Sequence, residues 1–159
     1  MRAYQVFASL PPERAPELFT RLREKSPLVF QQALAVASAA LKARPVYLAR
    51  QPFEKQAEAA RRALARVAAN VVAEEVLASY FLQCQGDLLI EWLDSLGLAH
   101  EKGTLSEDHP AEPPPDVLRK AVEALRAKGD DWNRELLLRA FAAQDAIDWP
   151  ALETLLAAR

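Results

Sequence analysis

Residues 26–41, which read SPLVFQQALAVASAAL, form the longest uncharged run in the chain. The fold class depends on whether this run is a core helix or a membrane span. Ser26 followed by Pro27 is typical of a helix start: serine caps helices, and proline at the first helical position loses no hydrogen bond. The residues that follow are apolar nearly all round, which predicts a central helix packed on several sides. The run is shorter than the ~20 residues of a membrane span and contains two glutamines, so we expect a core helix and no membrane partner.

The same helix-start signal recurs on both sides of this run: a proline or a capping residue precedes an amphipathic segment. Alanine and leucine make up 55 of the 159 residues, whereas valine, isoleucine and threonine make up 15, a balance that favours helices over strands. We therefore predict an all-α fold, an irregular bundle of seven or eight helices. Helices are expected at 11–25, 27–43, 53–68, 70–84, 87–96, 117–128, 132–141 and from Pro150 onward, with Asp87, Asp116 and either Asp130 or Asp131 as N-caps.

Residues 98–115 interrupt this pattern, because they contain no helical period. Lys102-Gly103 favours a short hairpin, and the prolines that follow favour an extended strap. The interruption predicts an N-terminal helical unit at 1–97, the hairpin and Pro-rich strap at 98–115, and a C-terminal helical subdomain at 116–159. A piece as short as this subdomain is near the lower limit of independent stability, so we expect it to dock on the first unit within one compact domain.

The transition from helix to hairpin at residues 92–105, WLDSLGLAHEKGTL, resembles the end of a winged-helix unit running into its wing. The resemblance implies contact with nucleic acid through the hairpin at 98–105. A DNA-reading wing is normally basic, because attraction to phosphates dominates such binding. Residues 86–116 instead contain eight carboxylates and one lysine. A helix C-cap followed by a surface hairpin is therefore the favoured interpretation, and we expect no nucleic-acid partner.

The charge is divided along the chain. Residues 1–85 carry 12 positive and 7 negative groups, whereas residues 86–159 carry 8 positive and 15 negative groups. The positive charge concentrates in residues 42–66, which carry seven cations against Glu54 and Glu58. This stretch includes an arginine-rich helix at 53–68, whose arginines are expected to face solvent, with Glu58 preceding Arg62 by four residues in the favourable order. Two interpretations stay open: attraction between the two halves of the chain, or an anionic partner for this helix.

One stretch offers metal-ligating residue types: His100, Glu101, Glu107, Asp108 and His109. Imidazole and carboxylate groups bind zinc, manganese or iron, but this spacing matches no helix-borne metal motif. The four glycines are isolated, so the chain has no glycine-rich phosphate loop. We therefore expect solvated side chains, no metal and no cofactor.

Catalytic residue types are sparse. Cys84 lies near a predicted helix end without an evident cationic neighbour, which favours a buried, inert thiol. Glu74 and Glu75 are placed near the positive end of the helix at 70–84, where the helix dipole explains them. A catalytic alternative would use these glutamates, Asp87 or His100 in a cleft between helices.

The leading functional hypothesis is a soluble helical protein-interaction or scaffold module without catalytic activity, in the cytoplasm of a bacterial type of cell. The first alternative is a nucleic-acid-associated regulator that uses the helix at 53–68 and the wing-like hairpin at 98–105. The second is an enzyme with a carboxylate-based site between helices. The candidate partner surface comprises Arg61, Arg62, Arg66, His100 and Glu101.

Overall fold

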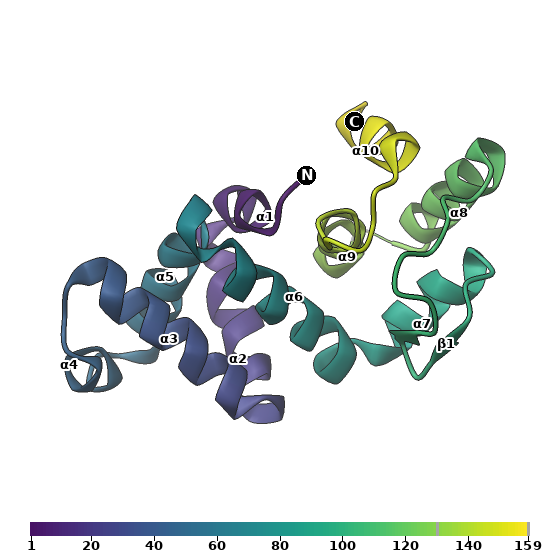
Figure 1. The fold of residues 1–159 in the computed structure, drawn as a ribbon. Helices are drawn as coiled ribbons and strands as arrows, with labels where there is room; N and C mark the ends of the chain where they lie inside the picture. Colours follow the sequence, from purple (N-terminus) through teal and green to yellow (C-terminus); the bar gives the residue numbers. More distant parts are fainter. Residues whose placement is uncertain (130, 159) are drawn as a thin grey trace. The chain divides into compact units, whose positions relative to one another are not determined.

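The structure, a computed structural model, describes residues 1–129 and 131–158. It is 72% helical, with ten α-helices and one two-stranded hairpin in the described part of the chain, so the predicted all-α fold is confirmed (Figure 1). The chain divides into two compact units, residues 2–84 and the residues from 85 onward. The sequence-based division at 98–115, with docking of the last segment, stays a prediction. No helix among the described residues is both long enough and apolar enough to cross a membrane.

The first unit consists of six helices and two 3₁₀ turns. Its elements are α1 (Ala3–Ser9), η1 (Pro12–Arg14), α2 (Ala15–Lys25), α3 (Pro27–Leu41), α4 (Pro45–Ala49), α5 (Phe53–Leu64), η2 (Val67–Ala69) and α6 (Asn70–Cys84). The short helices α1 and α4 were not predicted, because fewer than eight residues cannot display a helical period. They bring the count from the expected seven or eight to ten. The predicted first helix is likewise divided into η1 and α2.

The second unit consists of four helices and the hairpin. Its elements are α7 (Gly86–Ser95), β1 (His100–Glu101), β2 (Thr104–Leu105), α8 (Pro115–Ala127), α9 (Trp132–Ala142) and α10 (Pro150–Ala157). Two predicted caps are wrong: Gln85 precedes α7 and Pro114 precedes α8, so Asp87 and Asp116 lie inside the first turns. Asp131 does cap α9, accepting a hydrogen bond from the Asn133 backbone N–H at 3.0 Å, whereas Asp130 lies outside the described residues.

α3 packs against four other helices of its unit, α2, α4, α5 and α6. Phe30, Ala33 and Ala37 form part of its buried face. The expectation of a central helix packed on several sides is confirmed. Leu28, near the start of α3, is 80% exposed, and Leu41, its last residue, is 56% exposed.

A row of aromatic rings forms the centre of the first unit. Phe19 is fully buried, with its ring centroid 6.4 Å from that of Phe7 and 6.2 Å from that of Phe30. Phe30 in turn lies 6.0 Å from Phe53, and the Arg23 guanidinium carbon lies 4.2 Å from the Phe53 ring centroid. Rings at these separations gain from edge and offset contacts in addition to apolar burial, so the row joins α1, α2, α3 and α5.

The helix predicted at 53–68 ends early, at Leu64. The chain then passes through η2, where Val67 is 67% exposed instead of lying on the buried stripe. The predicted break before Asn70 is confirmed, and the Asn70 Oδ1 accepts the Tyr4 backbone N–H at 3.2 Å. Glu74 and Glu75 lie beyond the first turn of α6, so the helix dipole does not explain them.

The second unit is built on the buried face of α7. Trp92 is fully buried, and its ring meets that of Phe141 edge-on at 5.7 Å. Phe141 meets Trp149 in the same way at 5.3 Å. Gly97, at φ +70°, ends α7 as predicted, because a left-handed residue at this position lets the Leu98 backbone N–H bond the Leu93 carbonyl.

The hairpin and the strap are both ordered. Lys102 and Gly103 have φ values of 52° and 93°, the two left-handed residues that a tight hairpin turn requires. The Trp149 indole Nε1 donates to the Pro110 carbonyl at 2.9 Å, and the Glu112 carboxylate accepts the Ala151 backbone N–H at 2.8 Å. The strap therefore caps the start of α10 and satisfies a buried indole.

Candidate functional site

An open groove of about 730 Å³ lies between α3 and α5 in the first unit, two helices that run side by side in Figure 1. It involves residues singled out in the sequence. The residues lining it are Ala37, Ala40, Leu41, Glu54, Lys55, Glu58, Ala59, Arg62, Ala63 and Arg66. Five are apolar and five are charged, so the groove has an apolar component with charged side chains beside it.

The apolar part of the groove is made almost entirely of alanine. Ala37 on α3 and Ala63 on α5 are buried, whereas Ala40 and Ala59 are half-buried. Leu41, the one large apolar side chain, is 56% exposed. Short side chains on two packed helices leave a trench into which another backbone can approach closely.

One carboxylate of the groove is already paired. Arg61 donates two hydrogen bonds to Glu58, from its Nη2 to the Glu58 Oε1 at 2.7 Å and from its Nε to the Glu58 Oε2 at 2.9 Å. The hydrogen bond from Arg61 lowers the pKa of Glu58, and the reciprocal bond raises the pKa of Arg61. The Arg61 side chain is only 14% exposed, so the expectation that it faces solvent and that Glu58 pairs with Arg62 is wrong.

Unlike Arg61, the three cations that line the groove form no ion pair with a carboxylate of the described residues. Lys55, Arg62 and Arg66 are exposed, and none of them is within 4.0 Å of a carboxylate oxygen among residues 1–129 and 131–158. Two carboxylates line the same groove: Glu54, and Glu58, which is hydrogen-bonded to Arg61 and also attracted to Arg62. The groove thus presents an excess of positive charge beside an apolar trench.

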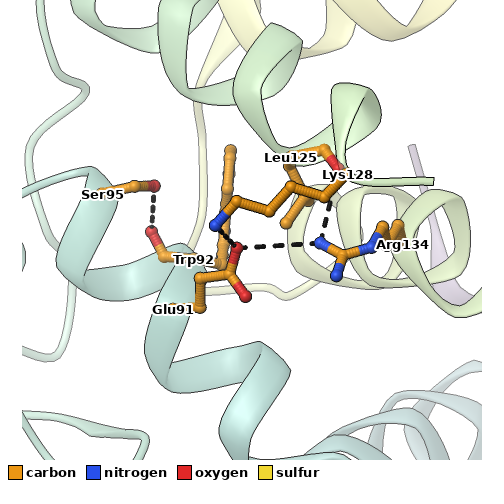
Figure 2. Close-up of polar contacts among 6 residues, drawn as sticks. All are labelled: Glu91, Trp92, Ser95, Leu125, Lys128 and Arg134. Carbon is orange, nitrogen blue, oxygen red and sulfur yellow. Dashed lines mark hydrogen bonds and ion pairs between the residues drawn. The ribbon is translucent and has the colours of Figure 1, made fainter.

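In the second unit, three cations form ion pairs between helices: Arg126, Lys128 and Arg134. Glu91 on α7 contacts the Lys128 ammonium and lies 3.7 Å from the Arg134 guanidinium, which also donates to the Leu125 carbonyl at 3.4 Å (Figure 2). Arg126 likewise pairs with Glu135 at 2.6 Å. These cations join α7, α8 and α9 to one another, whereas those of the groove join nothing in their unit.

His100 and Glu101, the other members of the predicted partner surface, lie on β1 in the second unit. Glu101 is exposed. His100 Nε2 lies 2.6 Å from the Asp94 carboxylate, and its Nδ1 accepts the Gly103 backbone N–H at 3.1 Å. Both ring nitrogens are therefore engaged in holding the hairpin against the end of α7, which leaves neither available to a substrate.

The sequence did not single out Asp94 as the partner of His100. The two residues are six apart, on opposite sides of the turn that ends α7, and no helical spacing relates them. The positive φ of Gly97 reverses the chain between them and brings them together. A predicted C-cap followed by a histidine is the only signal that could have suggested this pair.

The remaining candidate side chains do not converge. Glu75 and Asp87 are exposed and Glu74 is half-buried. Glu107, Asp108 and His109 are exposed in the segment after β2. Within the described ranges, no three His, Cys, Asp or Glu side chains lie close enough together to hold a metal ion.

Cys84, at the end of α6, is half-buried instead of fully buried. Burial raises the pKa of its thiol, an effect that the nearby Arg21 and Lys25 charges oppose and Glu24 reinforces. The sequence had shown no cationic neighbour, because these residues come from α2. The net direction still favours the protonated, unreactive thiol over the thiolate at neutral pH.

The raised pKa predicts slow thiol–disulfide exchange at native Cys84. At about pH 8, where a free cysteine is partly ionised, the folded chain should react with a disulfide reagent such as DTNB more slowly than the urea-unfolded chain. The native rate should rise as the pH is increased further, because the thiolate then forms. Stopped-flow absorbance measures both rates. A native rate equal to the unfolded rate would mean that burial does not control this thiol.

The groove between α3 and α5 is therefore the arrangement that carries a functional argument in this chain. It brings together Arg62 and Arg66 from the predicted partner surface and leaves Arg61 to an internal pair. Comparisons of the chain with protein-family models, with curated proteins and with solved structures find no match.

Proposed function

We propose that this chain is a non-catalytic protein-interaction module that binds a helical segment of another protein in the groove between α3 and α5. The observation that carries the proposal is the alanine-lined trench flanked by three cations without a partner in their unit. Grooves between packed helices are a recurrent way of binding an amphipathic helix, whose apolar face occupies the trench. The engaged nitrogens of His100 and the exposed positions of Glu75 and Asp87 argue in the same direction.

The proposal is tested by filling the trench. A library of helical peptides is selected by display on the full chain, and the enriched peptides are measured against Ala59→Phe. Ala59 is half-buried in the groove, so a phenyl ring there should occupy part of the trench. The matched control is Ala35→Phe, an exposed alanine of α3 that does not line the groove.

Peptide affinity should fall about tenfold or more in Ala59→Phe, equivalent to ~1.4 kcal/mol. It should stay within about twofold in Ala35→Phe, since that ring adds bulk outside the groove. Circular dichroism checks that both variants remain helical. Equal affinity of the selected peptides for both variants, or no enrichment in the selection, would contradict the proposal.

The nucleic-acid alternative makes an opposite prediction about the same arginines. Binding through several phosphates would give an affinity that falls steeply with salt, with a slope of about −0.9 per phosphate for duplex DNA. We expect no appreciable duplex binding at physiological salt, because the chain carries a net charge of −2 and Arg61 is tied to Glu58. Electrophoretic mobility shift over a salt series measures this.

The control for that experiment is the combined substitution of Arg61, Arg62 and Arg66 by alanine. Arg62 and Arg66 are exposed, so their removal should leave stability nearly unchanged, and loss of the Arg61 pair should cost about 0–1 kcal/mol. Submicromolar DNA or RNA binding that disappears in this folded variant would replace the protein-interaction proposal by the regulator alternative.

A further inference from the structure

The charges along α5 restrict the kind of helix that the groove accepts. Resting on the proposed function, we infer that the partner segment is an acidic amphipathic helix with two carboxylates spaced two turns apart. Three features of the groove support this inference. They are its three cations, its alanine trench and its one paired carboxylate.

The sign of the partner's charge follows from the pairing within the groove. Lys55, Arg62 and Arg66 have no carboxylate partner within the described residues. Glu58 is held by two hydrogen bonds from Arg61, so its attraction to Arg62 is Coulombic only, without a hydrogen bond. An occupant with carboxylates would find these cations ready to pair, whereas a basic occupant would meet like charge at three positions.

The spacing of the carboxylates follows from helix geometry. Lys55 and Arg62 are seven residues apart on one face of α5, a separation of about 10.5 Å along the axis at 1.5 Å per residue. A second helix lying along the groove presents groups at this separation from positions i and i+7. Arg66 follows the end of α5 in an extended conformation, φ −89° and ψ 144°, so it extends the cationic row without fixing a helical position.

The size of the apolar face follows from the trench. Its lining side chains are short on both walls, from Ala37 and Ala40 on α3 to Ala59 and Ala63 on α5. Such a trench favours an occupant with one narrow apolar stripe between its acidic positions over one that is apolar all round. An apolar stripe with flanking charges is the pattern that sets register in helix pairs.

The experiment uses three synthetic helical peptides of about 18 residues, roughly five turns. The first carries glutamates at i and i+7 beside an alanine and leucine stripe. The second has the same composition with the glutamates on the opposite face, and the third replaces both glutamates by lysine. Fluorescence anisotropy measures each peptide against the wild-type chain, Arg62→Glu and the control Lys120→Glu, an exposed cation of α8 outside the groove.

The first peptide should bind the wild-type chain about tenfold more tightly than the other two. Arg62→Glu should weaken its binding about tenfold and strengthen binding of the lysine peptide, whereas Lys120→Glu should change either affinity less than twofold. A reversal of peptide preference in Arg62→Glu but not in Lys120→Glu distinguishes direct pairing of the peptide with Arg62 from a general loss of positive charge.

Other outcomes identify what fails. If the lysine peptide or the displaced-glutamate peptide binds equally well, and Ala59→Phe still weakens binding, the acidic inference is overturned while the proposed function stands. If Ala59→Phe affects no peptide, both fail. A dimer in analytical ultracentrifugation that Arg62→Glu dissociates would assign the groove to a second copy of this chain and overturn the inference of a foreign helix.

Discussion

Replacing Trp92 with alanine is expected to destabilise the second unit by about 3–5 kcal/mol. The indole is fully buried on α7, and its ring packs edge-on against Phe141 at 5.7 Å. Its removal takes a large apolar area out of the core and leaves a cavity that the neighbouring helices can fill only in part. Phe141 would also lose one of its two aromatic neighbours, so its contact with Trp149 would no longer be supported from the other side.

The measurement benefits from where the tryptophans lie. Trp92, Trp132 and Trp149 all belong to the second unit, and the first unit has none. Tryptophan fluorescence during urea unfolding therefore follows the unit that contains all three tryptophans, while circular dichroism follows the helices of both units. Trp132 and Trp149 remain as probes in the variant. Val117→Ala on α8, where the side chain is 41% exposed, should cost less than about 1 kcal/mol. A cost below ~1 kcal/mol for Trp92→Ala would contradict the assigned core.

Long periodic segments could be predicted from the sequence, and short or locally controlled features could not. The stripe containing Leu88, Trp92 and Leu93 is buried as its spacing predicts, and Gly97 adopts the left-handed conformation that ends a helix. The N-caps of α7 and α8 were misplaced because Gly86 and Pro115 can themselves occupy the first helical position. Sequence chemistry allows both starts, and tertiary packing selects one.

The burial of α3 shows a second limit. Its nearly continuous apolar sequence predicted packing on several sides, which is confirmed, but did not indicate which residues stay uncovered. Apolar content shows what a helix can bury, while the positions of neighbouring helices decide what it does bury. Of the two exposed leucines of α3, Leu41 lines the groove, whereas Leu28 does not.

The site itself was predicted in part. The sequence singled out Arg62 and Arg66 as members of a cationic surface, and the structure brings both to the groove. It could not show that Arg61 turns inward, because Glu58 has a cation both three and four residues later, and both spacings bring side chains together on a helix. The α3 wall could not be predicted either, since Ala37 and Ala40 become neighbours of α5 only through tertiary packing.

Replacing Phe19 with alanine is expected to destabilise the first unit by about 3–5 kcal/mol. Phe19 is fully buried in the middle of the aromatic row, between Phe7 at 6.4 Å and Phe30 at 6.2 Å. Its loss interrupts the row at the point where α2 joins α1 to α3. Leu28→Ala is the matched control, because that side chain is 80% exposed and its truncation should change stability by no more than about 0.5 kcal/mol.

Cys84 supplies the probe for this unit, which has no tryptophan. The thiol is half-buried at the end of α6, so unfolding of the first unit should accelerate its reaction with DTNB, and Phe19→Ala should shift that acceleration to lower urea. A shift no larger than that of Leu28→Ala would remove Phe19 from the core. Phe19 does not line the groove, so peptide affinity under conditions where the variant stays folded should match that of the wild type. Arg62→Glu should behave in the opposite way, with weakened peptide binding and a change in stability of no more than about 0.5 kcal/mol, the size expected for losing the attraction to Glu58 and placing like charges four residues apart on an exposed face.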